Sequence, residues 1–277
     1  MDGRKSSHSI SSDQLYARLG TALAPVVVDV RKANDFEADD RVIASAIRRD
    51  PERDPHWFKG LPADRTIVAY CVHGWNVGQE AAAALRSAGL QGVYLDGGIA
   101  DWKEKHLPTR RRLPASTEAW VTREHPKIDR IACPWLISRF IDPKAEFLYV
   151  PASEVFAIAS KTGAIAYDIE GAEFAHEGER CSFDTILRIF GVEDSALDRL
   201  ALIVRGADTS RHDLAPQCGG LFAISLGLSA NFPDDHEMLA RGMVIYDALY
   251  TWCRSLQSET HNWPAKMSVN QSAAFQN

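Results

Sequence analysis

Residues 67–90, IVAYCVHGWNVGQEAAAALRSAGL, place a cysteine directly after a short apolar run. Residues 66–71 are short and β-branched in character, which predicts a buried strand that ends at Cys71. Residues 79–88 have helical character, and Gly89 follows in the position favoured after a helix C-terminus. Because ligands of open α/β sheets bind beyond the carboxyl ends of the strands, Cys71 is a candidate for chemistry.

The loop after Cys71 has the composition of an anion-binding turn. Residues 72–78, VHGWNVG, are expected to form a short loop whose backbone amides point inward, with the dipole of the following helix behind them. Such a loop favours the thiolate, which is the nucleophilic form of cysteine. The alternative is a buried, inert cysteine that ends a core strand. The residues alone leave both interpretations open.

The composition limits the classes of protein to which the chain can belong. Its 277 residues suggest two domains, and 45% hydrophobic with 25% charged residues is typical of a globular protein. A formal charge of -6 disfavours nonspecific nucleic-acid binding. The first residues contain no apolar signal-peptide core, and no segment approaches the ~20 apolar residues of a membrane span. We therefore expect a cytoplasmic protein with no membrane partner, whose five cysteines are reduced.

Strand-like and helical segments alternate through residues 1–108. This order predicts an α/β domain in which helices cover a parallel sheet, with strands at 26–30, 66–71 and 92–98. Residues 109–122 lack a sustained periodicity and are expected to form a linker in which the basic triplet 110–112 is solvated.

Residues 123–258 are expected to form a second, helix-rich α+β domain, and the polar residues 259–277 a mobile tail. Apolar residues from Ile131 to Phe140 recur at helical spacing until Asp142 and Pro143 end the run. The other expected elements are strands at 145–151 and 164–171 and helices at 155–161, 183–192, 195–208, 220–230 and 236–256.

Three segments of the first half resemble the motifs of rhodanese-like sulfurtransferases, in the family's order, over about residues 10–108. They are VVVDVRKANDF, CVHGWNVGQEAAAAL and VYLDGGIADWKEKHLP. The resemblance implies that Cys71 takes a sulfane sulfur from a small donor as a persulfide and passes it to a thiol acceptor, without a cofactor. It also implies that Asp29 and Arg31 support the loop. The loop that would hold the persulfide comprises Val72, His73, Gly74, Trp75, Asn76 and Val77.

The loop departs from the family pattern at two positions. Typical members that use thiosulfate carry Arg five residues after the cysteine and Ser or Thr next to it, where this chain has Asn76 and Val77. Without that guanidinium, a bidentate grip on a sulfonate is lost, so we expect thiosulfate to be a poor donor. His73 supplies part of the missing charge when protonated, or is merely exposed. The family's GHIPGA segment is replaced by DRVIASA.

The second half resembles the C-terminal domain of bacterial chromate-resistance proteins, over roughly residues 117–255. The segments that carry this resemblance are PKIDRIACPWLISRFIDPKAEFLYVP, GAEFAHEGERCSFDTI and LALIVRGADT. A rhodanese-like domain followed by this domain is the order of the sulfurtransferase/chromate resistance proteins. The resemblance implies a link to chromate or another oxyanion, and it implies no settled reaction for the second domain.

Cys133 is the candidate for a second reactive thiol. Pro134 fits the first turn of a helix, which would place Cys133 at or near the N-cap, where the helix N-terminus stabilises a thiolate. Lys127 and Arg130 are close in sequence. Cys133 would then receive sulfur from Cys71 or be oxidised by chromate. The alternative is a small apolar residue at the start of a helix.

A second constellation could hold a divalent metal. His176 and Cys181 are five residues apart in a Gly- and Glu-rich turn, and Asp184 comes one helical turn later. Histidine, cysteine and carboxylate side chains together can form a transition-metal site, to which Asp129 and Asp208 from other elements would add ligands. The alternative is a polar cluster that caps helices and pairs with nearby arginines.

These observations support two functions of different classes. The first is a sulfurtransferase with Cys71 as the nucleophile. The second is a non-catalytic sensor or regulatory protein for oxyanion or redox stress, in which the loop only binds a ligand. Retention of Cys71 favours the enzyme, and loss of the loop arginine favours the sensor. The sequence does not determine the oligomeric state.

Overall fold

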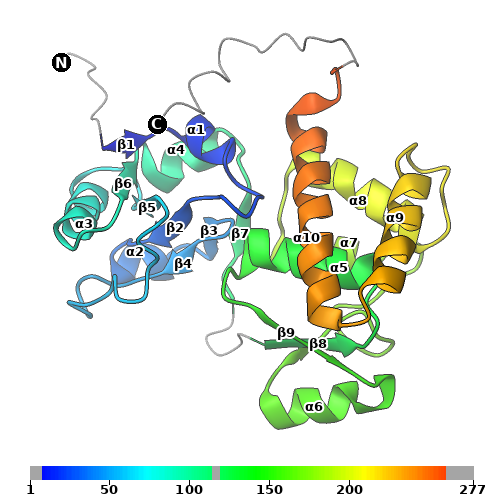
Figure 1. Ribbon diagram of the computed structural model, residues 1–277. Coiled ribbons are helices and arrows are strands. Elements are labelled where there is room, and N and C mark those ends of the chain that lie inside the picture. Colours follow the sequence, from blue (N-terminus) through cyan, green and yellow to red (C-terminus); the bar gives the residue numbers. More distant parts are fainter. Residues whose placement is uncertain (1–7, 114–118, 260–277) are drawn as a thin grey trace.

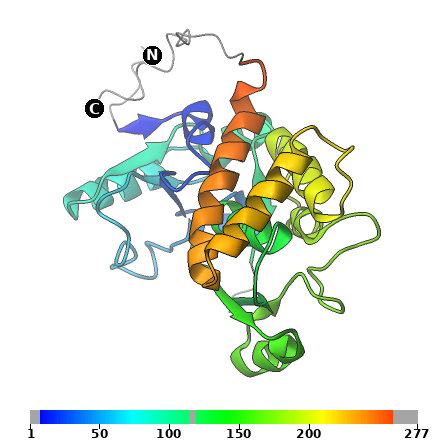
Figure 2. The same cartoon turned by 45° about the vertical axis from the view of Figure 1, so that its right-hand side comes forward.

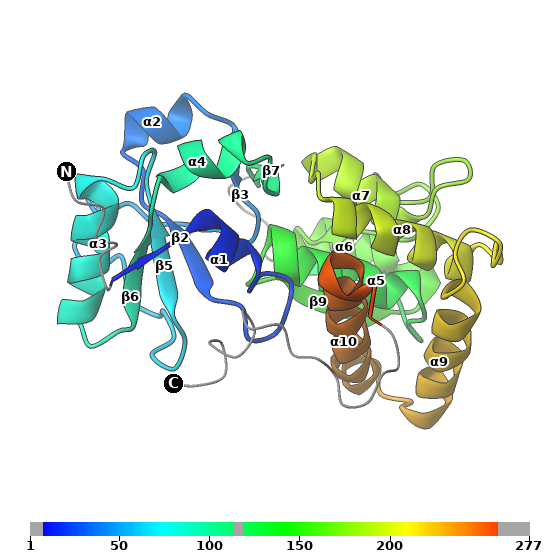
Figure 3. The same cartoon turned by 90° about the horizontal axis from the view of Figure 1, so that it is seen from above.

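The computed structural model describes residues 8–113 and 119–259, which form two lobes in contact with each other (Figure 1). Seen from above, helices α1 to α4 belong to one lobe and α5 to α10 to the other (Figure 3). Within the described ranges, no helix is both long enough and apolar enough to cross a lipid bilayer.

A five-stranded parallel sheet forms the centre of the first lobe, as the alternation of strands and helices predicted. The order of the strands is β1 (Ser9–Ile10), β6 (Gly92–Leu95), β5 (Ile67–Tyr70), β2 (Val26–Asp29) and β4 (Ile47–Arg48). The helices are α1 (Ser12–Tyr16), α2 (Ala33–Glu37), α3 (Asn76–Ser87) and α4 (Gly98–Glu104).

Successive residues of the central strands pack on opposite faces of this sheet. Val68 and Tyr70 of β5 pack in one cluster with Leu15 of α1 and Trp102 of α4. Ala69, between them, packs in a second cluster with residues of α3. Because side chains alternate along a strand, β5 must be apolar throughout to fill both layers. Cys71 is the next residue after this run.

The second lobe is rich in helices and contains a smaller parallel sheet, in agreement with the expected α+β class. The strand order is β10 (Ile165–Ala166), β8 (Ala119–Arg123) and β9 (Glu146–Val150). The helices are α5 (Asp129–Leu136), which continues as a π-helical turn (Ile137–Ile141), α6 (Val155–Thr162), α7 (Ser182–Phe190), α8 (Ser195–Asp208), α9 (Cys218–Asn231) and α10 (Asp235–Thr251). Short 3-10 and π-helical turns precede α6 (Ala152–Glu154) and follow α10 (Trp252–Leu256). Figure 2 shows α10 running along this lobe with α9 beside it.

Trp135 lies at the centre of the second core. Its ring is fully buried and lies 5.6 Å from both the Phe140 and the Tyr250 ring. The indole N–H donates to Asp247 at 2.8 Å, so the polar end of the ring is also satisfied. The apolar spacing that predicted a helix through residues 131–140 therefore corresponds to the face that α5 buries.

The expected linker is wrong for its first residues. Strand β7 (Thr109–Arg111) pairs antiparallel with β3 (Arg41–Ile43), so the chain leaves the first lobe as part of a two-stranded sheet. Arg110, expected in solvent, is 4% exposed and donates to the Ala46 carbonyl at 2.9 Å. The end of the expected linker belongs to β8. Residues 114–118 of the expected linker and residues 260–277 of the expected tail lie outside the described residues.

Arg41 connects the two lobes through main-chain carbonyls. Its guanidinium donates to the carbonyls of Phe190 and Gly191 at the C-terminus of α7, and to Thr109 on β7. Carbonyls in the last turn of a helix lack partners within the helix, so a charged donor from the other lobe satisfies them. Tyr16 of α1 adds a second contact, since its hydroxyl donates to Asp194 at 2.6 Å.

We predict that Arg41→Ala lowers the free energy of unfolding by about 2 kcal/mol, because it leaves carbonyls at the lobe interface without donors. Urea denaturation followed by tryptophan fluorescence measures this change. The matched control is Arg53→Ala, whose side chain is 79% exposed and which should change stability by less than about 0.5 kcal/mol. Equal effects of the two variants would show that Arg41 does not stabilise the interface.

Candidate functional site

Cys71 is held at the carboxyl end of β5 by main-chain hydrogen bonds to α4. Its carbonyl accepts from Ile99 N at 3.0 Å, and the Val72 carbonyl accepts from Ala100 N at 2.9 Å. The side chain is buried, with 6% of the residue exposed. The expected position at the end of a strand is therefore correct, and the start of the loop is fixed by α4.

The sulfur of Cys71 lies against the first turn of α3. A β-carbon on Gly78 would come within 3.3 Å of Sγ, so this glycine gives the sulfur room beside the helix. No side chain caps α3 at Trp75. Within residues 8–113 and 119–259, the amides of residues 72–77 donate no hydrogen bond. Unpaired amides at a helix N-terminus attract negative charge, so this surrounding suits an anionic sulfur.

Two glycines allow the loop to close on the neighbouring helix. Gly74 (φ +72°) and Gly98 (φ +59°) both adopt left-handed backbone conformations. A β-carbon on Gly74 would clash with the Leu95 carbonyl, and one on Gly98 would clash with the carbonyls of Cys71 and Val72. Only glycine fits both the conformation and the space at these positions.

The outer side of the loop is exposed and aromatic. Trp75 is 68% exposed, and its ring lies 4.8 Å from the His73 ring. Asn76 and Val77 line a cleft of about 410 Å³ beside the start of α3, together with Trp57. The cleft also contains charged residues of both signs, namely Arg31, Lys32, Asp50, Glu52 and Glu80.

Asp29 and Arg31 form a buried ion pair whose other hydrogen-bond partners lie outside the loop. The Arg31 guanidinium donates to both Asp29 oxygens, with the shortest contact at 2.6 Å, and also to Asp39 at 2.8 Å. Tyr70 donates to the same carboxylate at 2.7 Å. These contacts hold the segment that leads into β3, so the expected support of residues 72–77 by this pair is not seen in the hydrogen bonds of the described residues.

A second polar site lies in the other lobe, where three carboxylates surround one imidazole. His176 Nε2 lies 3.2 Å from Asp208, 3.5 Å from Asp168 and 3.6 Å from Asp129. Asp129 begins α5 and Asp208 ends α8, so the two ends of separate helices meet here. Atoms of Asp129, His176 and Asp208 lie close enough together to bind one metal ion.

Burial and charge set the protonation of this cluster. Hydrogen bonds to Asp129, Asp168 and Asp208 raise the pKa of His176 to about 12. Burial, opposed by His176, raises the pKa of Asp129 to about 6. Hydrogen bonds stabilise the ionised form of the buried Asp129 side chain. Its oxygens accept from the amides of Ser182 and Phe183 at the start of α7. In this cluster the positive charge of the His176 imidazolium offsets the negative charge of the carboxylates. A divalent cation would offset the same charge.

Cys133 is not at the start of a helix. Helix α5 begins at Asp129, so Cys133 lies in its second turn, fully buried, and donates to Asp129 at 3.4 Å. Burial, followed by the Asp129 charge, raises the pKa of the Cys133 thiol well above its usual value. The helix accommodates Pro134 because the Arg130 carbonyl, left without its amide donor, accepts from the Tyr149 hydroxyl. The expected position at the N-cap is therefore wrong, and the contacts favour the alternative of a small buried residue, inside the helix and not at its start.

Cys181 and Asp184 lie beside the imidazole cluster but have other partners. Asp184 accepts from the Cys181 amide and pairs with Arg205, with the shortest contact at 2.6 Å. Burial raises the pKa of the Cys181 thiol well above its usual value. At these two residues the helix-capping interpretation describes the contacts.

Asp168 was not among the candidates from the sequence, although its carboxylate is part of the cluster. It follows β10 in the turn YDIEG, has a left-handed backbone (φ +49°), and accepts from Ser182 Oγ at 2.8 Å. Arg123 and Arg130 pair with its other oxygen at 3.3 and 3.4 Å. A carboxylate after the end of a strand, like Asp129 before a helix, is the signal that could have identified it.

Family comparisons agree with this division into two lobes. The family described as Rhodanese-like domain matches residues 11–105, and the family described as ChrB, C-terminal domain, matches residues 120–253. The chain combines a rhodanese-like domain with a ChrB C-terminal domain. Both resemblances inferred from sequence motifs are confirmed. Cys71 belongs to the rhodanese-like domain and the imidazole cluster to the ChrB C-terminal domain.

Individual relatives each cover part of the chain. Protein ChrB of Cupriavidus metallidurans is 35% identical over 160 residues, and the match covers 57% of this chain and 48% of that protein. The chain thus spans about half the length of this relative. An uncharacterized protein of Synechocystis is 29% identical over 52% of this chain and 80% of its own length. A solved rhodanese-related protein from Thermoplasma volcanium is 31% identical over 37% of this chain and 96% of that chain, with a TM-score of 0.33.

We predict that Gly98→Ala lowers the free energy of unfolding by roughly 3 kcal/mol, because the new methyl group meets two backbone carbonyls and the backbone is left-handed. The control is Gly89→Ala. Gly89 has φ +80° but open space around it, so only the conformational cost of about 1 kcal/mol remains. Urea denaturation of both variants measures the difference. Similar values for the two would show that the loop tolerates a larger separation from α4.

Proposed function

We propose that the chain is a rhodanese-type sulfurtransferase that forms a persulfide on Cys71. The observation that carries this proposal is the position of Sγ against the uncapped first turn of α3, beside amides that have no partner among the described residues. A persulfide anion on Cys71 would extend the charge toward these donors. Preorganised amide donors stabilise developing negative charge without reorganisation.

The reaction is a pair of displacements at sulfur. The Cys71 thiolate attacks the sulfur that is transferred and forms a new S–S bond. In thiosulfate or a polysulfide an S–S bond breaks, and sulfite or the shortened polysulfide leaves with the electron pair. In 3-mercaptopyruvate the C–S bond breaks, and the enolate of pyruvate leaves with the electron pair. An acceptor thiolate then attacks the same sulfane sulfur, and the Cys71 thiolate is the leaving group. The cycle is redox-neutral and needs no cofactor.

The loop favours donors other than thiosulfate. Asn76 and Val77 occupy the start of α3, and neither provides the guanidinium that would grip a sulfonate. A polysulfide and 3-mercaptopyruvate contain no sulfonate group, so neither depends on that guanidinium. The exposed His73 and Trp75 rings provide a surface on which a donor or an acceptor thiol could approach the loop.

The ChrB C-terminal domain supports a role in resistance to chromate or another oxyanion. The match to this domain and the 35% identity to Protein ChrB of Cupriavidus metallidurans are its basis. Persulfide chemistry suits such stress, because the persulfide formed on an acceptor thiol can donate electrons to an oxidant. The non-catalytic sensor differs from the enzyme in one respect: it needs the loop but not the Cys71 sulfur.

We predict that wild-type protein incubated with thiosulfate, 3-mercaptopyruvate or a polysulfide gains about 32 Da, one sulfur, in intact-protein mass spectrometry, with polysulfide the most effective donor. Cys71→Ser should gain nothing. Cys218→Ser, which removes a buried thiol in the other lobe, should gain as much as wild type. No gain on wild type with any donor would reject the sulfurtransferase and leave the sensor as the better proposal.

We also propose that the ChrB C-terminal domain binds a divalent metal ion through Asp129, His176 and Asp208, with Asp168 beside them. The observation that favours this second function is the convergence of three carboxylates on one imidazole nitrogen at 3.2 to 3.6 Å. A set of oxygens with one imidazole suits ions such as Mn²⁺ or Zn²⁺. The coordinating nitrogen must lose its proton, so binding should release a proton at neutral pH.

We predict that chelator-treated protein binds Mn²⁺ or Zn²⁺ in isothermal titration calorimetry, and that His176→Ala and Asp208→Asn weaken binding by at least about tenfold. His125→Ala removes an exposed histidine outside the cluster and should bind like wild type. Titrations in buffers of different ionisation enthalpy should show release of about one proton in wild type. Unchanged affinity in His176→Ala would contradict the site.

A further inference from the structure

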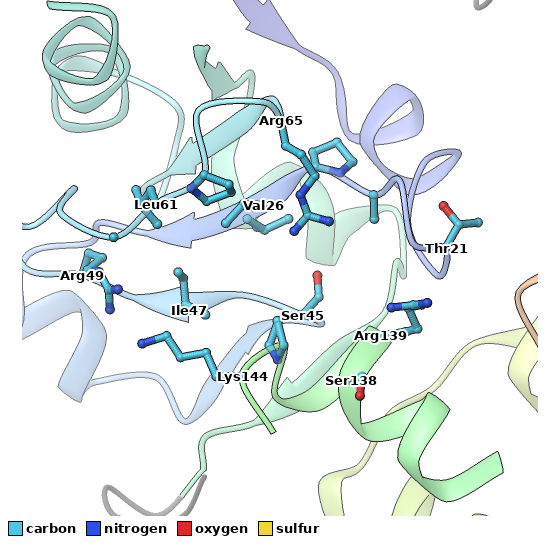
Figure 4. A pocket seen from close by; sticks show the side chains of 16 residues that line it. Thr21, Val26, Ser45, Ile47, Arg49, Leu61, Arg65, Ser138, Arg139 and Lys144 are labelled. Carbon is cyan, nitrogen blue, oxygen red and sulfur yellow. The ribbon is translucent and has the colours of Figure 1, made fainter. Parts of the chain in front are cut away.

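A pocket of about 310 Å³ lies between the two lobes (Figure 4). The first lobe contributes Ser45, Arg49 and Arg65, and the second contributes Arg139 and Lys144. Figure 4 shows these side chains around a common space, with the Arg65 guanidinium and the Ser45 hydroxyl directed into it. Neither domain forms this pocket alone.

The charge of the pocket wall has one sign. Four of its lining residues carry positive charge, and none of the lining residues in the described chain is acidic. Arg139 forms an ion pair with Asp247, with Nε of Arg139 2.9 Å from a carboxylate oxygen, so its charge has a counter-ion. Among residues 8–113 and 119–259, the Arg49 and Arg65 side chains donate only to the main-chain carbonyls of Arg48 and Ala22, respectively. Among the described residues, no carboxylate pairs with Arg49, Arg65 or Lys144. The pocket therefore holds about three positive charges that lack a protein counter-ion.

Ser45 provides an independent sign of a missing ligand. The residue is 8% exposed, and its hydroxyl has no hydrogen-bond partner among the described residues. Its backbone is left-handed (φ +68°), a conformation that glycine adopts more readily. The Ser45 amide donates to the Phe140 carbonyl of the other lobe at 2.7 Å, which fixes this turn at the interface. A buried hydroxyl without a partner is costly unless something else binds it.

The pocket is distinct from the Cys71 loop. Its walls include Pro25 and Val26 at the start of β2 and the residues that lead into β5, whereas Cys71 follows the end of β5. All strands of this sheet are parallel, so these walls lie at the amino ends of β2 and β5, whereas Cys71 lies at the carboxyl end of β5, and no residue of the Cys71 loop lines the pocket. An anion bound here would not occupy the persulfide loop.

We propose that this interlobe pocket binds a small molecule that carries a tetrahedral oxyanion group, of the sulfate or phosphate type. Guanidinium groups match the oxygens of such groups with paired hydrogen bonds, and Lys144 adds a mobile charge. The Ser45 hydroxyl donates to a further oxygen. The volume exceeds that of a bare tetrahedral anion and lies at the lower end for small-molecule sites, so an organic ester also fits.

A ligand bound between the lobes must stabilise their contact. Because cations of both lobes face the pocket, their mutual repulsion opposes docking until an anion binds. The anion therefore binds the docked arrangement better than a separated one, and it raises the thermal stability of the whole chain. This inference does not depend on sulfur transfer at Cys71.

The test is a titration of the full-length chain with sulfate and, separately, with adenosine monophosphate, at constant ionic strength maintained with chloride. We expect saturable binding in calorimetry and a higher melting temperature. The double variant Arg49→Gln/Lys144→Gln should weaken binding by at least about tenfold, because it removes two charges from the wall. Tighter binding of adenosine monophosphate than of sulfate would identify an organic ester as the ligand class, and the reverse a free oxyanion.

Ser45→Ala separates a binding role from a structural one. Since the hydroxyl has no partner in the described chain, its removal should leave the melting temperature of ligand-free protein unchanged or higher, while sulfate binding weakens several-fold. Arg53→Gln and Lys161→Gln remove exposed charges elsewhere and should bind like wild type, as should Cys71→Ser. Unchanged affinity in the double variant, or no saturable binding of either anion by wild type, would overturn the proposal.

Discussion

The backbone of Cys71 and Val72 lies so close to Gly98 that no β-carbon fits between them. This approach depends on two hydrogen bonds to the start of α4 and on a left-handed residue at the helix start. It holds the end of β5 at a fixed distance from α4, and the loop must then cross toward α3. The sulfur of Cys71 then lies beside Gly78 in the first turn of α3. The chemistry proposed for Cys71 is therefore a consequence of backbone packing more than of any neighbouring side chain.

The Cys71 loop and the His176 cluster stabilise negative charge in different ways. At Cys71 the donors are main-chain amides, which carry no formal charge and leave the site able to accept an anion. In the ChrB C-terminal domain, Asp129 is buried beside two other carboxylates, and the imidazolium of His176 offsets their repulsion. In the proposed reaction, the site at Cys71 gains a negative group. In the proposed metal site, a metal ion replaces the proton of His176.

The sequence was sufficient for the elements that are decided by local pattern. The strand before Cys71 and the helix after it were predicted because a short β-branched apolar run and a run of helix formers leave few other structures. Cys133 was misplaced because Pro134 was taken as the first turn of its helix, whereas the helix begins at Asp129. The carbonyl that Pro134 leaves unpaired finds its partner in Tyr149, a residue of another element. Such compensation depends on tertiary contacts and has no signal in the local sequence. Asp168 follows the end of a strand, which is a local signal, but its partners Arg123, Arg130 and Ser182 come from other elements.

Strand β7, which carries Arg110, limits where the chain can be cut into separate domains. Because β7 pairs with β3 and Arg110 is buried against Ala46, the segment after the rhodanese-like domain is part of that domain's structure. Arg41 on β3 donates to the Gly191 carbonyl and so caps the C-terminus of α7 in the ChrB C-terminal domain. A cut near residue 108 would leave an unpaired strand edge on one fragment and an uncapped helix on the other. The two domains are thus better regarded as one cooperative folding unit than as modules that could be exchanged separately.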